Sequence, residues 1–189
     1  RALEEEIDIA VPHRVVAPSR RRAVASLDDS TMSLSPSPSP STSHRVFVYG
    51  TLKRGLHNHV LLERARASFV GPARTTRASF AMLLADAGYP YVVKTTTNAR
   101  AIDGEVYAVD DDTLERLDAL EEIATGMYSR ERVEVTMTAT HAAAAAETTV
   151  VEAFWYLAGS RDDLERLPRI ETYDKRIHDE MYVPKHLRG

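Results

Sequence analysis

From Arg45 onward the chain is a succession of short apolar segments separated by glycine and proline. These segments are rich in β-branched and aromatic side chains, the composition typical of β-strands. One longer segment, opened by the aspartates at 110–112, has the apolar spacing of an amphipathic helix. Because strands and helices do not alternate regularly, a parallel βαβ sheet is not expected. The pattern predicts an α+β domain built around a small barrel or a strongly bent sheet.

The glycine and proline residues between the apolar segments set the boundaries of the expected elements. In the segment 130–138, Val133, Val135 and Met137 alternate with polar residues, which is the two-residue period of a half-buried strand. A polyalanine stretch at 142–146 is expected to form a variable hairpin loop, and the charged C-terminal segment from 161 is expected to contain one or two short helices. The expected strands are 45–49, 68–76, 81–84, 91–95, 103–109, 130–138 and 148–157, and the expected helices are 58–65 and 111–122.

Residues 1–44 differ in composition from the rest of the chain. They combine an acidic opening, a basic cluster at 20–22 and a Ser-Pro repeat from Ser33 to Pro40. Alternating proline removes backbone donors and holds the backbone extended, so such a segment does not build a packed core. We predict a disordered leader or linker over 1–44 and one folded domain over 45–189. The Arg, Ala and Ser content near its middle is weakly similar to an organelle transit peptide, although the preceding acidic residues argue against one.

Composition excludes several kinds of chemistry and partner. The chain has no cysteine, which rules out disulfides, thiol catalysis and thiolate metal sites and is compatible with a reducing compartment. A net charge of −4 gives no electrostatic reason to expect nucleic acid or an anionic membrane as a partner. No apolar run approaches the roughly 20 residues that cross a bilayer. We therefore expect a cytoplasmic protein that binds neither nucleic acid nor membrane.

Glu121 is the acidic residue that the helical pattern singles out. Leu114, Leu117 and Glu121 lie at positions i, i+3 and i+7, so they share one face of the expected helix, while Asp118 and Glu122 are expected to point more toward water. An apolar wall would raise the pKa of this carboxyl group and make it a base near neutral pH. From the spacing alone, the favoured alternative is a helix-terminal glutamate that bends into solvent or meets an arginine.

The second feature is the segment Tyr49-Gly50-Thr51-Leu52 at the end of the first expected strand. A strand that ends in Gly-Thr can turn so that successive backbone N–H groups point into one cavity, where they bind a carboxylate or a developing oxyanion. The alternative, slightly favoured by the local sequence alone, is an ordinary strand exit whose residues only turn the chain.

The remaining candidates are weaker. His57 and His59 form a His-x-His pair without a third metal ligand nearby, so no metal site is expected. Tyr128 and Tyr182 each offer a hydroxyl group to a ligand, although most tyrosines at such positions are structural. The sequence lacks a phosphate-binding loop, a nucleophile elbow and a dinucleotide-binding fingerprint.

Taken together, these stretches resemble the γ-glutamylaminecyclotransferases and the related plant AIG2-like proteins. The resemblance spans about residues 45 to 185, in the order that the family has. It rests on the run 46–55 with Asn58-His59, the strand 104–109, Leu117-Asp118 with Glu121, Tyr128 with Arg130, and Tyr182-Val183-Pro184.

The resemblance implies a fold, a site and a reaction. The implied fold is a small mixed β-barrel with flanking short helices and no cofactor, and the implied reaction converts a γ-glutamyl amine, such as γ-glutamyl-ε-lysine, into 5-oxoproline and free amine. The alternatives are a cyclotransferase for γ-glutamyl amino acids or glutathione-like substrates, a non-catalytic γ-glutamyl-binding protein, and an interaction protein that docks through the Ser-Pro segment. By residue match the catalytic residue is Glu121, and the substrate-binding residues are Tyr49, Gly50, Thr51 and Leu52, with Tyr128 and Tyr182 as further hydroxyl donors.

Overall fold

The computed structural model describes residues 43–138, 149–159 and 163–188 of the chain. Of the expected leader at 1–44, only residues 43 and 44 are described. The expected polyalanine loop at 142–146 lies outside the described residues. All statements below concern the unit that Thr42–Gly189 forms.

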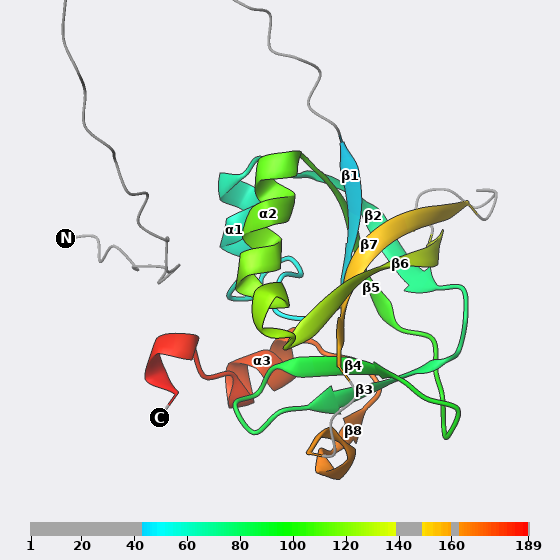
Figure 1. Ribbon diagram of the computed structural model, residues 1–189, viewed down its shortest axis with the longest axis vertical. Coiled ribbons are helices and arrows are strands. Elements are labelled where there is room, and N and C mark those ends of the chain that lie inside the picture. The colour runs from blue at the N-terminus through cyan, green and yellow to red at the C-terminus, as the bar shows by residue number, and fades with distance from the viewer. Residues whose placement is uncertain (1–42, 139–148, 160–162, 189) are drawn as a thin grey trace, which may run out of the picture. The chain divides into compact units, whose positions relative to one another are not determined.

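Five strands close into a barrel, in the order β1-β5-β2-β6-β7 (Figure 1). The pairs β1/β5, β5/β2, β2/β6 and β6/β7 are antiparallel, and the barrel closes where β7 runs parallel to β1, with Val46 opposite Phe154. This architecture confirms the predicted α+β class and mixed barrel. The barrel strands are β1 (His44–Val48), β2 (Ser68–Thr75), β5 (Asp103–Val109), β6 (Tyr128–Met137) and β7 (Val150–Ala158).

A second sheet of three strands, in the order β4-β3-β8, lies below the barrel in the view of Figure 1. Strands β3 (Phe80–Leu84) and β4 (Pro90–Lys94) form an antiparallel hairpin, and β8 (Arg169–Ile170) pairs with Met82 and Leu83. All five residues of β3 are buried, so it is packed on both faces. The sequence did not indicate β8, because two residues carry no periodic pattern.

The helices are short and flank the sheets. They are α1 (His59–Arg64), α2 (Asp111–Leu120) and α3 (Lys175–Met181), with 3₁₀ turns η1 (Ile123–Thr125), η2 (Leu164–Arg166) and η3 (Lys185–Leu187). Asp110 caps α2, because its carboxylate accepts hydrogen bonds from the backbone N–H and hydroxyl of Thr113 at 2.9 and 2.5 Å. Within the described residues, no helix has the length and apolar character needed to cross a membrane.

Two apolar clusters fill the unit. One is centred on the fully buried Trp155, which packs against Phe47, Tyr49 and Phe80. The other packs under α1 and α2 and joins these helices to the barrel. It includes Val46, Val48, Leu52, Leu62, Leu114, Leu117, Tyr128 and Tyr156. This second cluster fixes the C-terminal end of α2 against the barrel.

Candidate active site

Glu121 directly follows α2, and its backbone N–H still donates to the carbonyl oxygen of Leu117 at 3.0 Å. Leu114 and Leu117 are buried on the same helix face, which brings Glu121 against the barrel. The residue is partly exposed as a whole, yet burial of its carboxyl group, helped by the nearby charge of Glu122, raises its pKa to about 7. Among the described residues the carboxyl group has no hydrogen bond or ion pair. It is therefore an acid that can take up or release a proton near neutral pH.

Phenol groups surround this carboxyl group. The pKa values of Tyr49, Tyr128 and Tyr156 are all raised, chiefly by burial, and the negative charge of Glu121 adds to each shift. The hydroxyl of Tyr49 donates to the backbone oxygen of Tyr156 at 2.6 Å. The ring of Tyr128 stacks on that of Tyr91, with 5.6 Å between the centroids. Residues of β6, β7 and the segment just after β1 thus lie within electrostatic reach of Glu121, and the predicted roles of Tyr49 and Tyr128 in substrate binding stay predictions.

The loop after β1 leaves its backbone donors free. Within the described residues, the N–H groups of Gly50, Thr51 and Leu52 have no acceptor. The carbonyl oxygens of Gly50 and Thr51 accept instead from the N–H groups of Lys53 and Asn58, both at 3.1 Å, and the side-chain amide of Asn58 donates to the Thr51 hydroxyl at 2.8 Å. These bonds hold the turn while leaving three amides unpaired, an arrangement that suits an anion.

Gly50 also lies close to the second sheet. A Cβ atom built on Gly50 would come within 3.0 Å of the Pro90 side chain at the start of β4. The absence of a side chain there lets the loop approach the β3–β4 hairpin closely.

Tyr182 packs beside the segment that follows β1, where its ring contacts that of His57. Burial raises the pKa of its hydroxyl and nearby Arg188 and Asn58 oppose that shift, while its ring packs on those of His57 and His178. Glu121 is not among these partners. Tyr49 and Tyr128 thus lie within electrostatic reach of Glu121, whereas Tyr182 contacts the segment after β1 through the ring of His57. A direct contact of Tyr182 with substrate stays a prediction.

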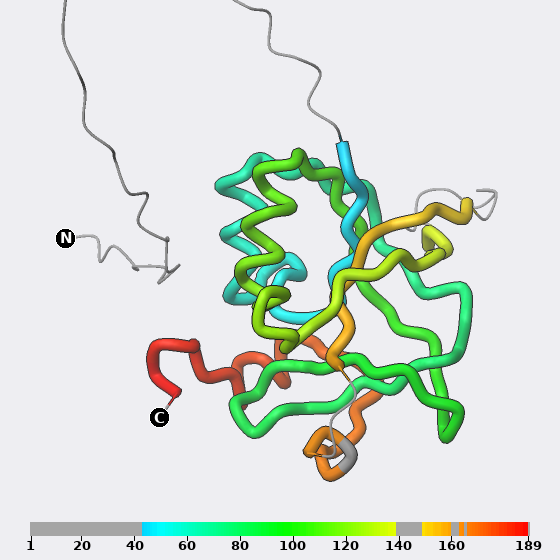
Figure 2. Tube along the Cα trace, viewed as in Figure 1, coloured from blue at the N-terminus to red at the C-terminus, as the bar shows by residue number. Residues whose placement is uncertain are grey.

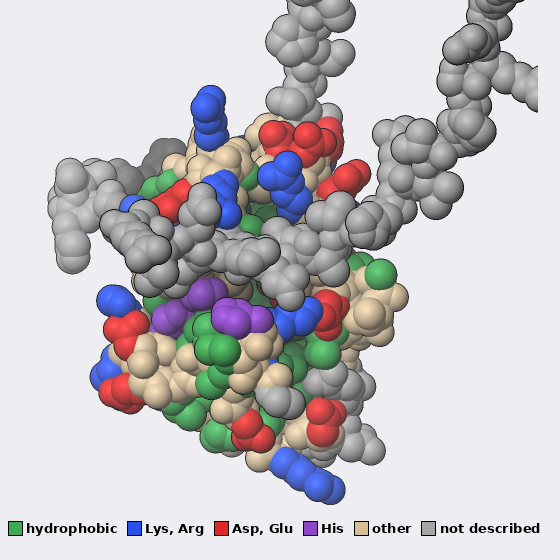
Figure 3. Space-filling model, turned by 90° about the vertical axis from the view of Figure 1, so that its left-hand side faces the viewer, with side chains coloured by type: hydrophobic (Ala, Val, Ile, Leu, Met, Phe, Trp, Pro, Cys, Tyr) green, Lys and Arg blue, Asp and Glu red, His purple; other side chains and the backbone are tan. Residues whose placement is uncertain are grey.

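The histidines gather on the face shown in Figure 3 and take part in the same support. His178 donates from Nδ1 to the Tyr173 hydroxyl at 2.8 Å, because that hydroxyl already donates to Gly88 O at 2.7 Å. The other ring nitrogen of His178 then accepts the backbone N–H of His57 at 3.3 Å. Burial lowers the pKa of His178, in keeping with a neutral ring. His59 bonds the carbonyl oxygen of Leu52 through Nδ1 at 3.0 Å.

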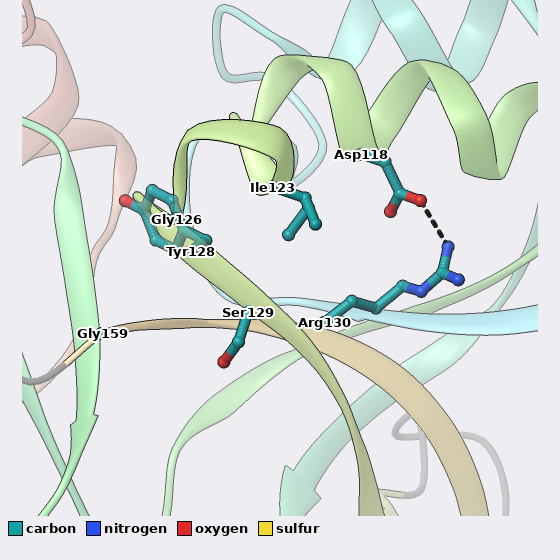
Figure 4. A pocket seen from close by; sticks show the side chains of 7 residues that line it. All are labelled: Asp118, Ile123, Gly126, Tyr128, Ser129, Arg130 and Gly159. Atoms are coloured by element: carbon teal, nitrogen blue, oxygen red, sulfur yellow. Dashed lines mark hydrogen bonds and ion pairs between the residues drawn. The ribbon is translucent and has the colours of Figure 1, made fainter.

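A cavity of about 510 Å³ adjoins this region (Figure 4). Of the predicted site residues, only Tyr128 lines it. Asp118, which the sequence placed more toward water, is partly exposed and also accepts hydrogen bonds from Tyr156 Oη at 2.8 Å and Arg130 Nη1 at 2.6 Å, which the sequence did not predict. The cavity is lined by Asp118, Ile123, Gly126, Tyr128, Ser129, Arg130 and Gly159.

Sequence reasoning missed the roles of Asp118, Tyr156 and Tyr91 in this region. The Tyr-x-Arg spacing was a usable signal that Tyr128 and Arg130 line the same wall, because alternate residues of a strand lie on one face. No such local signal links Asp118 to Tyr156, which is 38 positions away.

A closed barrel that carries one acid of raised pKa, beside buried phenols and a loop of unpaired amides, defines a class of protein equipped for acid–base chemistry on an anionic small molecule. Residues 46–182 match the family model described as γ-glutamyl cyclotransferase, AIG2-like. The chain therefore belongs to the γ-glutamyl cyclotransferase, AIG2-like family, and it is an enzyme of the γ-glutamyl cyclotransferase type.

Individual relatives agree with this assignment. Human γ-glutamylaminecyclotransferase is 32% identical over 151 residues, which cover 76% of this chain and 98% of that protein. The bovine γ-glutamylaminecyclotransferase is 32% identical over 171 residues, covering 88% and 92%. The crystal structure of an AIG2-like protein from mouse is similar with a TM-score of 0.65 at 29% identity, covering 77% of this chain and 99% of that one.

Proposed function

We propose that the protein converts a γ-glutamyl amine into 5-oxoproline and the free amine, with Glu121 as the general base and then the general acid. The observation that carries the proposal is the raised pKa of Glu121, about 7, in a carboxyl group without a hydrogen-bond partner among the described residues. A base with a pKa near the working pH is best suited to proton transfer. The names of the human and bovine relatives support an amine as the leaving group.

The substrate carries its own nucleophile, so the protein needs none. The α-ammonium group of the γ-glutamyl moiety gives a proton to the Glu121 carboxylate, whose raised pKa of about 7 makes it a stronger base than an ordinary glutamate. The freed amine nitrogen attacks the γ-carbonyl carbon and closes a five-membered ring. The bond from that carbon to the leaving nitrogen then breaks, Glu121 returns the first proton to this nitrogen, and the second proton that the ring nitrogen loses also passes to the amine, which leaves as an ammonium ion. The sum is 5-oxoproline and an amine, and no further reactant is consumed.

The loop after β1 binds an anionic part of the substrate. The unpaired N–H groups of Gly50, Thr51 and Leu52 fit either the α-carboxylate or the oxyanion that forms during ring closure. Either contact holds the glutamyl chain curled, with its amine near its own carbonyl carbon, and such orientation lowers the barrier. The phenols of Tyr49 and Tyr128 border the same space and exclude water from it.

Replacement of Glu121 by glutamine tests the assignment. Glu121→Gln keeps the size of the side chain but removes the base, so we expect kcat for 5-oxoproline release to fall by about 10²- to 10⁴-fold. Glu115→Gln is the matched control, because Glu115 lies on the exposed face of α2 and should leave the rate unchanged. Release of 5-oxoproline by purified Glu121→Gln at the parent rate would show the assignment to be wrong.

A substrate panel tests the choice of leaving group. Wild-type protein is assayed with γ-glutamyl-ε-lysine and γ-glutamyl-alanine in parallel, and we expect the first to have the higher kcat/KM. A preference for γ-glutamyl-alanine would move the protein to the cyclotransferases for γ-glutamyl amino acids. Absence of 5-oxoproline from every compound would leave a binding protein and refute the proposal.

A further inference from the structure

Asn58 occupies the N-cap position of α1, yet its side chain makes no capping hydrogen bond to the residues that the structure describes. Asparagine is among the preferred N-cap residues, because its side-chain oxygen can accept a backbone N–H of the first helical turn. The N-cap residues of the other two α-helices, Asp110 and Asp174, both accept such a bond, each at 2.9 Å. The Asn58 side chain is therefore used for a different contact.

That contact is with Thr51 in the loop after β1. Nδ2 of Asn58 donates to the hydroxyl oxygen of Thr51 at 2.8 Å, and the backbone N–H of Asn58 donates to the carbonyl oxygen of Thr51 at 3.1 Å. Asn58 thus holds Thr51 through its side chain and its main chain together. A capping bond would use the amide oxygen of Asn58, whereas this contact uses the amide nitrogen as a donor.

The direction of this bond decides what the Thr51 hydroxyl can do. A threonine hydroxyl has one hydrogen to donate and two lone pairs that accept. Because one lone pair accepts from Asn58, the hydrogen is left for another partner, and it has none among the described residues. Thr51 is only partly buried, so this hydrogen is open to a ligand.

The hydroxyl adds a fourth donor to the three backbone N–H groups of Gly50, Thr51 and Leu52, which have no acceptor within the described residues. A carboxylate has about four lone-pair sites on its two oxygens. The oxyanion of a tetrahedral intermediate is a single oxygen, which fewer donors satisfy. The set of donors on this loop therefore fits the α-carboxylate of a γ-glutamyl group better than the oxyanion.

We propose that Asn58 is a positioning residue, which fixes the Thr51 hydroxyl as a donor to the α-carboxylate of the substrate. The proposal rests on the proposed cyclotransferase function and deepens it, because it gives the loop one anionic group to bind and gives the hydroxyl one polarity. A side-chain amide suits this role and stays neutral. An aspartate at position 58 would cap α1 but would accept the hydroxyl hydrogen that the substrate needs.

The test is a double-mutant cycle between positions 58 and 51. Asn58→Ser keeps a good N-cap residue and adds no charge, but its oxygen is one bond nearer the backbone than Nδ2 and does not reach Thr51. Thr51→Val removes the hydroxyl and keeps the branched shape. Arg64→Gly is the control, because Arg64 is exposed at the end of α1 and glycine weakens that helix without touching Thr51.

We expect Thr51→Val to raise KM for γ-glutamyl-ε-lysine at least about tenfold, since it removes a hydrogen bond to a charged group. Asn58→Ser alone should raise KM about three- to tenfold, with kcat within about twofold of the parent value. In the Thr51→Val background, Asn58→Ser should change KM by less than about twofold, because the hydroxyl that it positions is already absent. Arg64→Gly should leave KM unchanged.

Three results would overturn the proposal. Equal rises in KM in both backgrounds would mean that Asn58 acts through α1 or through Tyr182, and no rise in either would mean that it positions nothing. A fall in kcat at constant KM would assign the hydroxyl to the oxyanion instead. Retained kcat in each variant shows that the variant is folded.

Binding of the ring product gives a readout that does not depend on turnover. 5-Oxoproline carries the carboxylate, and 2-pyrrolidone is the same ring without it. Calorimetry should show that wild-type protein binds 5-oxoproline at least about tenfold more tightly, and that Asn58→Ser reduces this preference at least about threefold. An unchanged preference would refute the proposal. If wild-type protein releases no 5-oxoproline from any γ-glutamyl amine, the proposed function fails; if it does and positions 58 and 51 are not coupled, only the present inference fails.

Discussion

At the scale of single residues, the catalytic proposal depends on how the surroundings of Glu121 set its protonation. Burial is the larger cause of the raised pKa, and the charge of Glu122 is the second. Glu122 has a left-handed backbone, with φ of 52°, and its carboxylate is paired with Lys185 of η3. The other groups that face Glu121 are the neutral phenols of Tyr49, Tyr128 and Tyr156.

The pH dependence of the rate follows from this arrangement. Glu121 must be ionised to accept a proton, so kcat/KM should rise as pH increases through about 7. Glu122→Gln removes a negative charge that opposes ionisation, which lowers the pKa of Glu121, so the midpoint of this rise should move to lower pH. Steady-state kinetics between pH 5 and 9 on both proteins measure the shift. An unmoved midpoint would mean that another group controls the acid limb.

At the scale of elements, α3 and the residues around it hold the loop after β1. Lys53 donates from Nζ to the carbonyl oxygen of Tyr173, and His57 donates to the ring of His178 on α3. The same segment packs against the turn of the β3–β4 hairpin. A Cβ atom on Gly88 in this turn, where φ is +73°, would lie 2.2 Å from the backbone of Met181. Figure 2 shows α3 next to the end of this hairpin. The loop after β1 and the second sheet thus share one support.

Tyr173 is the centre of this support and gives a prediction at the same scale. Its side chain is fully buried, and its hydroxyl bonds both Gly88 O and His178 Nδ1. Tyr173→Phe leaves these two groups without that partner, so the free energy of unfolding should fall by about 1–3 kcal/mol. Urea titration measures the loss, and kinetics should show a higher KM with little change in kcat. An unchanged unfolding free energy would mean that the hydroxyl has no structural role.

Most elements were predictable from local pattern, and the exceptions have physical reasons. The alternation of Val133 and Val135 with exposed residues predicts β6 correctly, and the three aspartates predict the start of α2. The strand β8 was missed because two residues show no period. The division into a barrel and a second sheet was also missed, since continuous burial of β3 does not say which partners cover it.

The candidate site was predictable where chemistry and position coincide in one segment. The helical face that carries Leu114 and Leu117 singled out Glu121, although spacing alone favoured a glutamate that bends into solvent, and the raised pKa is what an apolar wall would produce. The partner of Asp118 was missed because helical spacing cannot show that β7 brings the hydroxyl of Tyr156 to it. Contacts between distant segments are set by the tertiary fold.

At the scale of the whole molecule, the acid to which we assign the proton transfers weakens the fold that holds it once that acid is ionised. The folded-state pKa of Glu121, about 7, is above its ordinary value of 4.5, so the folded protein binds this proton more tightly than the unfolded chain does. Its contribution to stability is fully present below about pH 4.5 and is lost as pH rises through about 7.

Glutamine at position 121 does not titrate, which gives a prediction about global stability. We compare the free energy of unfolding of Glu121→Gln with that of the wild-type protein. The difference, variant minus wild type, should be about 1–3 kcal/mol larger at pH 8 than at pH 5. Urea unfolding of both proteins at the two pH values measures this difference. Glu115→Gln serves as control and should show the same stability difference from wild type at both pH values. A Glu121→Gln protein whose difference is also independent of pH would mean that the carboxyl group is not buried.

The long separation between the loop after β1 and its supports has a consequence for biosynthesis. His57 and His178 are 121 positions apart, and Lys53 and Tyr173 are 120 apart. During translation the loop leaves the ribosome well before the residues that hold it, because domains emerge from the N-terminal side first. A nascent chain that already contains Glu121 therefore lacks the contacts that Tyr173 and His178 make with this loop, and these contacts form only after residue 178 has been added.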